Sequence, residues 1–216
     1  MRELSTAAAT LADKLRAELL DGAFPPGTRL KEEELAERFG VGRYTVRSAL
    51  RTLVATGLLE HELNRGARVP YLLPARVDEL YAYRTVLEVG ALRLAQSHDE
   101  SLAPVENATA ALVDLPDDTS WPEVIGVHQE VHRAIVVWSG NSRLLEAYAL
   151  CEQELAFVVA STRPNYTARQ LAELHIRLLD QLRRGGERAA AALARDIETG
   201  RRAVHDAMHT GTDEVG

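Results

Sequence analysis

The chain has only one cysteine, Cys151, and no long apolar run. A single cysteine excludes an internal disulfide and is typical of a cytosolic protein. No apolar stretch approaches the roughly 20 residues that a membrane-spanning helix needs, so we expect no membrane partner. Residues 1–20 carry Asp13 and Glu18 among small and charged residues, which is not the pattern of a secretory signal peptide. The sequence therefore predicts a cytoplasmic protein.

Acidic residues outnumber basic ones, and the formal net charge of −7 argues at first against a nucleic-acid partner. The imbalance is confined to one part of the chain. Residues 1–70 carry 11 Lys and Arg against 10 Asp and Glu, whereas residues 71–216 carry 14 against 22. No acidic residue lies between Glu37 and Glu60, and this interval contains Arg38, Arg43, Arg47 and Arg51. A basic stripe within an acidic chain is typical of an element that reads DNA.

Apolar spacing and turn residues predict a winged helix-turn-helix in the first 70 residues. A Pro-Pro-Gly break follows the first helix, a Gly-Val-Gly turn separates the second from the third, and a turn with Gly66 joins two short strands. The predicted segments are helices over 5–22, 32–39 and 43–56 and strands over 58–62 and 67–69.

The remainder of the chain predicts an all-helical bundle, so the fold class is mostly α. Residues 76–209 are rich in Ala, Leu, Arg and Glu, and five breaks divide them into about six helices. The expected organisation is a DNA-binding domain over 1–70, a linker over 71–76, a helical domain over 77–209 and a tail over 210–216.

The third helix carries arginines at intervals of four, which places them on one face opposite its apolar residues. An arginine fork can pair with guanine O6 and N7 or clamp a phosphate. Residues near the start of such a helix usually reach the bases, and basic or small wing residues approach the backbone or the minor groove. The DNA-binding candidates are Arg43, Tyr44, Thr45, Arg47, Arg65 and Gly66. An ordinary solvated basic face is the alternative.

These segments closely resemble the GntR family of bacterial regulators. The resemblance rests on Gly22-x-Phe24-Pro25-Pro26-Gly27, Glu34-Leu35-Ala36-x-x-Phe39-Gly40-Val41, Arg43-x-Thr45-Val46-Arg47 and Arg65-Gly66. It implies that Arg43, Thr45 and Arg47 contact operator DNA and that Gly66 lies at the wing tip. The chain departs from the family at Gly42, Tyr44 and Ser48, where Ser or Thr, Thr, and Glu are common.

The second half resembles the FCD effector domain of the FadR subfamily. The segments that carry this resemblance are Leu80-Tyr81-x-x-Arg84-x-x-Leu87-Glu88, Val131-His132-Arg133-Ala134-Ile135 and Glu173-Leu174-His175. Many such domains bind a divalent metal through an Asp and three His, and the corresponding residues here are His128, His132 and His175. The expected last histidine falls near Ile197, so Asp196, Glu198, a water or the effector would complete the site.

Imidazole ligands suit Zn or Ni, and an exchangeable position would accept a carboxylate effector that pairs with Arg84. Plainer interpretations remain open. His128 and His132 would then lie on a partly exposed face, His175 would be a hydrogen-bonded core residue, and Arg84 would form only an i,i+4 ion pair with Glu88.

The pattern as a whole predicts a ligand-responsive DNA-binding regulator, a repressor in the expected case. The resemblance implies a homodimer that binds a palindromic double-stranded operator and a small organic-acid effector. A metal-dependent hydrolase that uses His128, His132 and His175 is the alternative, although no HExxH-like motif or nucleophile elbow is present. A protein-binding adaptor is a third interpretation, which the arginine stripe disfavours.

Overall fold

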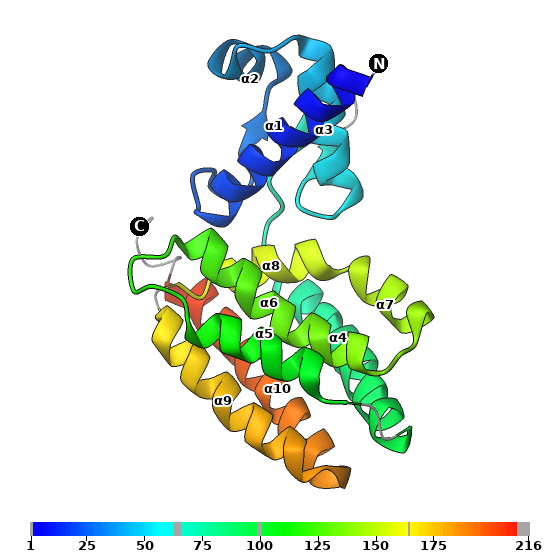
Figure 1. Ribbon diagram of the computed structural model, residues 1–216. Helices are drawn as coiled ribbons and strands as arrows, with labels where there is room; N and C mark the ends of the chain where they lie inside the picture. Colours follow the sequence, from blue (N-terminus) through cyan, green and yellow to red (C-terminus); the bar gives the residue numbers. More distant parts are fainter. Residues whose placement is uncertain (1, 63–65, 99–100, 164, 211–216) are drawn as a thin grey trace. The chain divides into compact units, whose positions relative to one another are not determined.

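The computed structural model describes residues 2–62, 66–98, 101–163 and 165–210 (Figure 1). The chain divides into two compact units between Leu72 and Leu73. The first unit combines three helices with three short strands, and the second is helical throughout its described residues. This confirms the mostly α fold class, with a winged helix-turn-helix followed by a helical bundle.

The first unit contains the helix-turn-helix that the glycine turn predicted. Its elements in chain order are α1 (Arg2–Leu20), β1 (Arg29–Leu30), α2 (Glu32–Phe39), α3 (Arg43–Ala55), β2 (Glu60–Glu62) and β3 (Gly66–Arg68). Gly40 ends α2 in the left-handed region at φ 64°, and the Val41 N–H donates to the Ala36 carbonyl. A residue with a side chain rarely adopts that φ, which explains glycine at this position.

Helix α3 has one buried aliphatic face and one polar face. Val46, Leu50 and Leu53 are buried, and α3 packs against α1, whose Leu11 and Leu15 are also buried. The chain can bury this stripe only by turning the remaining face of α3 outward. The core of the first unit therefore fixes which residues of α3 are presented to solvent.

The three strands form an antiparallel sheet in the order β1-β3-β2. Strand β1, which pairs Arg29 with Arg68 and Leu30 with Ala67, was not predicted from the sequence. Gly66 begins β3 at φ 91°, and a Cβ at this position would lie 3.3 Å from the Leu30 carbonyl oxygen. The close approach of β1 therefore adds to the backbone reason for glycine in the wing.

The second unit is built around α6, which packs against α4, α5, α7, α8 and α9. Figure 1 shows α5 alongside both α6 and α9, and α10 packs on α4 and α9. The helices are α4 (Pro74–Ser97), α5 (Ala103–Val113), α6 (Trp121–Trp138), α7 (Ser142–Ala149), α8 (Glu152–Ala160), α9 (Ala168–Arg184) and α10 (Gly186–Thr210).

The ends of α1, α3 and the two predicted wing strands differ from the sequence prediction by one to three residues, and the second unit differs in two further features. Helix α4 begins at Pro74, two residues earlier than expected, with proline in the first turn, where its missing N–H costs nothing. The described residues of this unit form seven helices rather than about six, because the chain breaks at Leu150 and Cys151 without a glycine or proline. Among the described residues, no helix combines the length and apolar composition needed to cross a bilayer.

The packing of α1 against α3 predicts a large effect for Leu15→Ala, because Leu15 is fully buried. Removing a buried leucine side chain typically lowers the free energy of unfolding by about 2–5 kcal/mol. The matched control is Lys14→Ala on the exposed side of α1, for which we expect a change within about 0.5 kcal/mol. Urea unfolding followed by far-UV circular dichroism measures both, and equal effects would contradict the assigned buried face of α1.

Candidate functional sites

The outward face of α3 presents the basic residues that the sequence singled out. The Arg43 and Arg47 side chains are 62% and 53% exposed, and Tyr44 is also exposed. Gly66 lies at the start of β3, and Arg65 lies outside the described residues. Thr45 differs from its neighbours, because it is only 5% exposed and belongs to the buried face of α3.

A broad hollow of about 920 Å³ lies between the first turn of α2, the exposed face of α3 and the wing strands. Arg43, Arg47 and Arg51 line one side of the hollow, and Gly66 and Ala67 line another. The geometry brings Arg43, Arg47 and the wing glycine to one concave surface. Glutamates from α2 and β2 line the same hollow, so its cations are partly neutralised by acidic neighbours.

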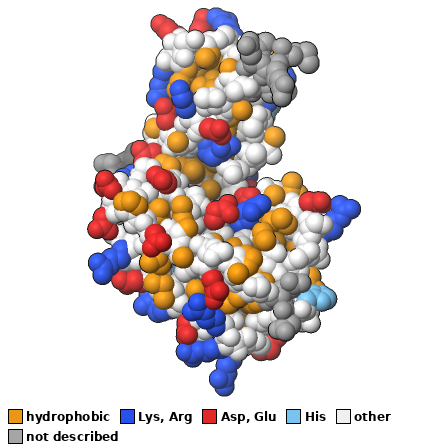
Figure 2. All heavy atoms as spheres, in the orientation of Figure 1, with side chains coloured by type: hydrophobic (Ala, Val, Ile, Leu, Met, Phe, Trp, Pro, Cys, Tyr) orange, Lys and Arg blue, Asp and Glu red, His pale blue; other side chains and the backbone are white. Residues whose placement is uncertain are grey.

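Acidic side chains from α2 pair with the α3 arginines, which the sequence reasoning missed. Arg47 donates from Nε and Nη2 to the two carboxylate oxygens of Glu32, at 2.8 and 2.7 Å. Arg43 donates from Nη2 to Glu33. Figure 2 shows the same pattern more widely, with acidic side chains beside basic ones on the visible surface. The signal in the sequence was the run Glu32-Glu33-Glu34, nine to fifteen residues before Arg43 and Arg47.

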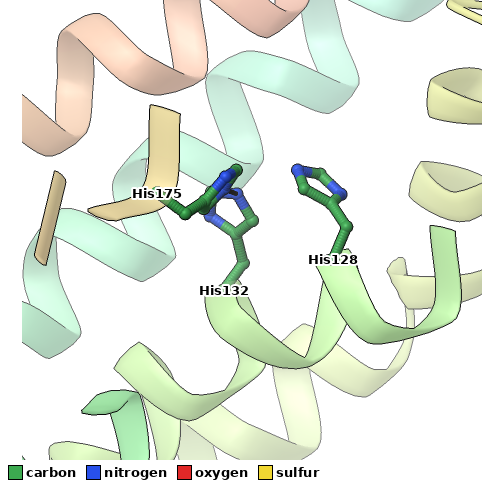
Figure 3. Close-up of side chains that lie close together, drawn as sticks. All are labelled: His128, His132 and His175. Atoms are coloured by element: carbon green, nitrogen blue, oxygen red, sulfur yellow. Dashed lines mark hydrogen bonds between the residues drawn. The ribbon is translucent and has the colours of Figure 1, made fainter. Parts of the chain in front are cut away.

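The second unit encloses a cluster of three histidines (Figure 3). His128 and His132 lie one turn apart on α6 and point toward His175 of α9. Their exposed fractions are 6%, 1% and 2%, so the interpretation in which the α6 pair lies on a partly exposed face is wrong. One ligand nitrogen from each ring lies within 4.8 Å of the others.

Two hydrogen bonds fix where the protons of His132 and His175 lie. His132 Nδ1 donates to Glu88 Oε2 at 2.9 Å, and His175 Nδ1 donates to the Leu171 carbonyl at 2.8 Å. The Leu171 carbonyl can only accept. Burial raises the pKa of Glu88, but its ion pair with Arg84 favours the carboxylate, which also only accepts, so each Nδ1 carries the hydrogen. Each neutral imidazole then has its lone pair on Nε2.

The two Nε2 atoms face each other at 3.1 Å. Two lone pairs at that distance repel unless a proton or a metal cation lies between or beside them. Nitrogens bound tetrahedrally to one Zn²⁺ at about 2.0–2.1 Å are themselves about 3.3–3.4 Å apart, slightly more than the separation here. His128 Nδ1 is buried with no hydrogen-bond partner among the described residues. The donor set therefore fits a divalent cation.

The local environment keeps the two α6 imidazoles in the form that binds metal. Burial lowers the pKa of His128 well below its usual value, and the neighbouring His175 and His132 lower it further. Burial also lowers the pKa of His132, with Arg84 adding to the shift. A neutral imidazole offers its lone pair to a metal, whereas a protonated one cannot.

The structure distinguishes between the two carboxylates, Asp196 and Glu198, that the sequence left as candidates for a further metal ligand. Asp196 Oδ2 lies 3.8 Å from His132 Nε2, and Asp196 lines the cavity beside the histidines. Both oxygens of Glu198 accept hydrogen bonds from Arg201, and Arg202 also donates to one of them. These bonds lower the pKa of Glu198 to about 2 and hold its carboxylate in a different network.

Arg84 and Glu88 form a fully buried ion pair next to the cluster. Arg84 Nε donates to Glu88 Oε1 at 2.6 Å, and the two side chains are 2% and 0% exposed. Burial lowers the pKa of Arg84, but the Glu88 carboxylate, together with Tyr148 and Tyr81, raises it overall. Glu88, which the sequence reasoning treated only as the partner of Arg84, also orients His132.

A small cavity of about 40 Å³ joins Arg84 to the histidines and Asp196. Arg84 Nη2 is buried with no hydrogen-bond acceptor among the described residues. The cavity thus brings together a guanidinium with an unused donor and a set of metal-binding nitrogens. A carboxylate meets both requirements, since it accepts hydrogen bonds from arginine and also coordinates metals.

Two family models match the chain in the order of its two units. The model of bacterial regulatory proteins of the gntR family matches residues 7–69, and the FCD domain model matches residues 79–199. The first match covers the helix-turn-helix and the wing, and the second covers the helices that hold the three histidines.

Curated relatives and solved structures agree with these matches. The chain is 30% identical over 188 residues to the "Uncharacterized HTH-type transcriptional regulator YdhC" of Bacillus subtilis, which covers 82% of this chain and 81% of that protein. It is 28% identical to the "Probable D-xylose utilization operon transcriptional repressor" of Paenarthrobacter nicotinovorans, over 84% and 80% of the two chains. A GntR regulator structure from Rhodococcus sp. RHA1 matches its fold with a TM-score of 0.75 at 24% identity, over 93% and 98%.

The matched gntR family and these relatives are transcriptional regulators rather than enzymes, which leaves the hydrolase alternative without support. The helix-turn-helix explains the exposed arginines, and the FCD match accounts for a ligand cavity in the helical unit. The chain therefore belongs to the GntR family of bacterial transcriptional regulators and carries an FCD domain as its helical effector unit.

Proposed function

We propose that this regulator reads a palindromic operator as a homodimer through α3 and the wing, and that an organic acid bound in the FCD domain controls its operator affinity. The observation that supports operator reading by α3 and the wing is the exposed arginine face of α3 beside the wing glycine. Arg43, Tyr44 and Arg47 are the proposed contacts from α3, and Arg65 and Gly66 those from the wing.

The burial of Thr45 limits its part in this proposal. A side chain on the packed face of α3 can reach DNA only through its hydroxyl at the edge of the helix, so we assign base reading to Arg43 and Arg47. Two copies related by a two-fold axis would present two such helices to successive major grooves. A bacterial DNA-binding role places the protein in the cytoplasm, where the chromosome lies.

In the FCD domain we propose that His128, His132 and His175 bind one divalent cation, with Asp196 as a further ligand. The support is the 3.1 Å separation of the two Nε2 lone pairs and the position of Asp196. Imidazole nitrogens favour Zn or Ni over Mg or Ca. When bound, the cation supplies positive charge and an exchangeable coordination position to the cavity.

The proposed effector is a small carboxylate held by Arg84 and the cation together. Arg84 has an unused Nη2 donor on the cavity. A cavity of about 40 Å³ holds on the order of three water-sized volumes, which suits a carboxylate group and excludes a pyranose sugar in this conformation. Glu88 keeps Arg84 charged and His132 oriented, so one buried carboxylate supports both binding groups.

Effector binding would change the placement of the two winged domains in the dimer and so alter operator affinity. Couplings of this kind typically amount to about 1–3 kcal/mol. We propose repression as the outcome, a direction that the repressor name of the Paenarthrobacter relative supports. The chain around Pro70–Pro74 connects the helix-turn-helix to the FCD domain and is the proposed place for this change.

The α3 assignment predicts that Arg47→Ala lowers affinity for the operator by roughly thirtyfold or more, because each protomer of the dimer loses one bidentate arginine–guanine contact. The operator is first selected by the wild-type protein from a pool of random duplexes, and affinity is then measured by gel retardation. Arg16→Ala is the matched control, since Arg16 lies on α1 and pairs with Asp13. Full sequence-specific retardation by Arg47→Ala would refute the role of Arg47.

The metal assignment predicts that His132→Ala loses bound Zn²⁺ and the stabilisation that comes with it. A ligand that binds only the native state at 100 times its Kd stabilises that state by about 2.7 kcal/mol. Elemental analysis and thermal unfolding with and without Zn²⁺ measure both effects. His98→Ala, an exposed histidine in the same unit, is expected to keep both. An unchanged metal content in His132→Ala would remove His132 from the site.

A further inference from the structure

The three acidic residues of the first turn of α2 differ in their contacts with α3, the helix that carries Arg43 and Arg47. Glu32 contacts Arg47 through both carboxylate oxygens. Glu33 makes a single contact with Arg43, and Glu34 pairs with Lys31 instead of an α3 residue. The Glu32 side chain is 26% exposed, compared with 75% for Glu33 and 64% for Glu34. Glu32 is therefore the only one of the three that grips an α3 arginine at two points from a partly buried position.

The geometry of the Arg47 guanidinium determines which of its N–H donors remain free when Glu32 is bound. Arginine has five N–H donors in a planar fork, and Glu32 uses the edge formed by Nε and Nη2. The second edge, formed by Nη1 and the other hydrogen of Nη2, also carries two parallel donors. Nη1 of Arg47 makes no hydrogen bond to another residue within the part of the chain that the structure describes. This second edge has the spacing that guanine O6 and N7 require.

We propose that Glu32 is a positioning residue for operator reading, which fixes the Arg47 guanidinium so that its free edge meets a guanine. The inference rests on the proposed role of Arg47 in base reading. A long arginine side chain normally loses several rotamers when it binds, and an arginine already held by Glu32 loses fewer. Glu32 thus favours the one duplex in which a guanine stands at the right place.

The negative charge of Glu32 lowers affinity for every duplex, whatever its base sequence. The hydrogen bond from Arg47 lowers the pKa of Glu32, which keeps the carboxylate ionised at neutral pH. A carboxylate in the hollow repels phosphates whatever the sequence of the bases. Glu32 is therefore expected to raise affinity for the selected operator relative to other sequences while it lowers affinity for DNA in general. A residue that only stabilised the packing of α2 on α3 would not separate these two quantities.

The test compares binding of Glu32→Gln to the duplex that the wild-type protein selects from a random pool and to a scrambled duplex of the same length. We expect the affinity for the selected duplex, divided by that for the scrambled duplex, to fall roughly three- to tenfold. This is the cost of ordering an arginine side chain that Glu32 no longer holds in place. Affinity for the scrambled duplex should stay level or rise. Glu34→Gln is the matched control, because it removes the same charge from the same helical turn but has Lys31 as its partner. Its ratio should stay at the wild-type value.

Two further variants separate failure of this inference from failure of the proposed function. If Arg47→Ala keeps the wild-type ratio, Arg47 does not read a base and the proposed function fails at this residue. If Arg47→Ala lowers the ratio but Glu32→Gln does not, the positioning role of Glu32 is wrong. The double variant Glu32→Gln/Arg47→Ala should have the ratio of Arg47→Ala alone. A further fall in the double variant would show that Glu32 acts through another route and would also overturn the inference.

Discussion

His132 donates its Nδ1 proton to Glu88, and His175 donates its own to a backbone carbonyl, so their Nε2 lone pairs meet at 3.1 Å inside the helical unit. With hydrogen on both Nδ1 atoms, a cation between the two Nε2 atoms relieves that repulsion. The FCD domain holds these rings in place with α6, α9 and the buried pair of Arg84 and Glu88. The packing therefore favours a cation at this place, and the proposed effector site adjoins it.

Each unit of the chain contains an arginine–glutamate pair, Arg84 with Glu88 and Arg47 with Glu32, and the two pairs serve different purposes. In the FCD domain Glu88 compensates a buried Arg84 and leaves one of its donors facing the cavity. In the winged helix-turn-helix Glu32 holds an exposed Arg47 and leaves one edge of its fork to solvent. In both places a carboxylate removes conformational freedom from a guanidinium without using all its donors, which prepares the arginine for an anionic or base partner.

The sequence predicted the features that depend on local pattern. The bounds of α2, the glycine turn and the apolar face of α3 follow from helical period and from the special φ of Gly40. The three histidines were found by an i,i+4 spacing on one helix and by the family resemblance, and the structure brings them together. The place of Thr45 on the buried face was missed, because the candidate was chosen for its nearness to the start of the helix and not for its helical register.

What the sequence could not supply depends on contacts between distant segments. Strand β1 has two residues and forms only because β3 lies beside it, so no period could reveal it. The break between α7 and α8 has neither glycine nor proline. Glu88 lies 44 positions from His132, and Glu32 lies 15 from Arg47, and neither distance carries a local signal. Likewise, the choice between Asp196 and Glu198 required knowing which arginines surround each carboxylate.

The protonation pattern of the buried histidines can be measured directly in the protein labelled with ¹⁵N-histidine. Long-range ¹H–¹⁵N spectra distinguish a nitrogen that carries hydrogen from one with a free lone pair, and also report metal binding. We expect hydrogen on Nδ1 of His132 and of His175, and Nε2 resonances of both that shift when one equivalent of Zn²⁺ is added. Hydrogen on Nε2 of either ring, or Nε2 resonances that ignore Zn²⁺, would contradict this assignment.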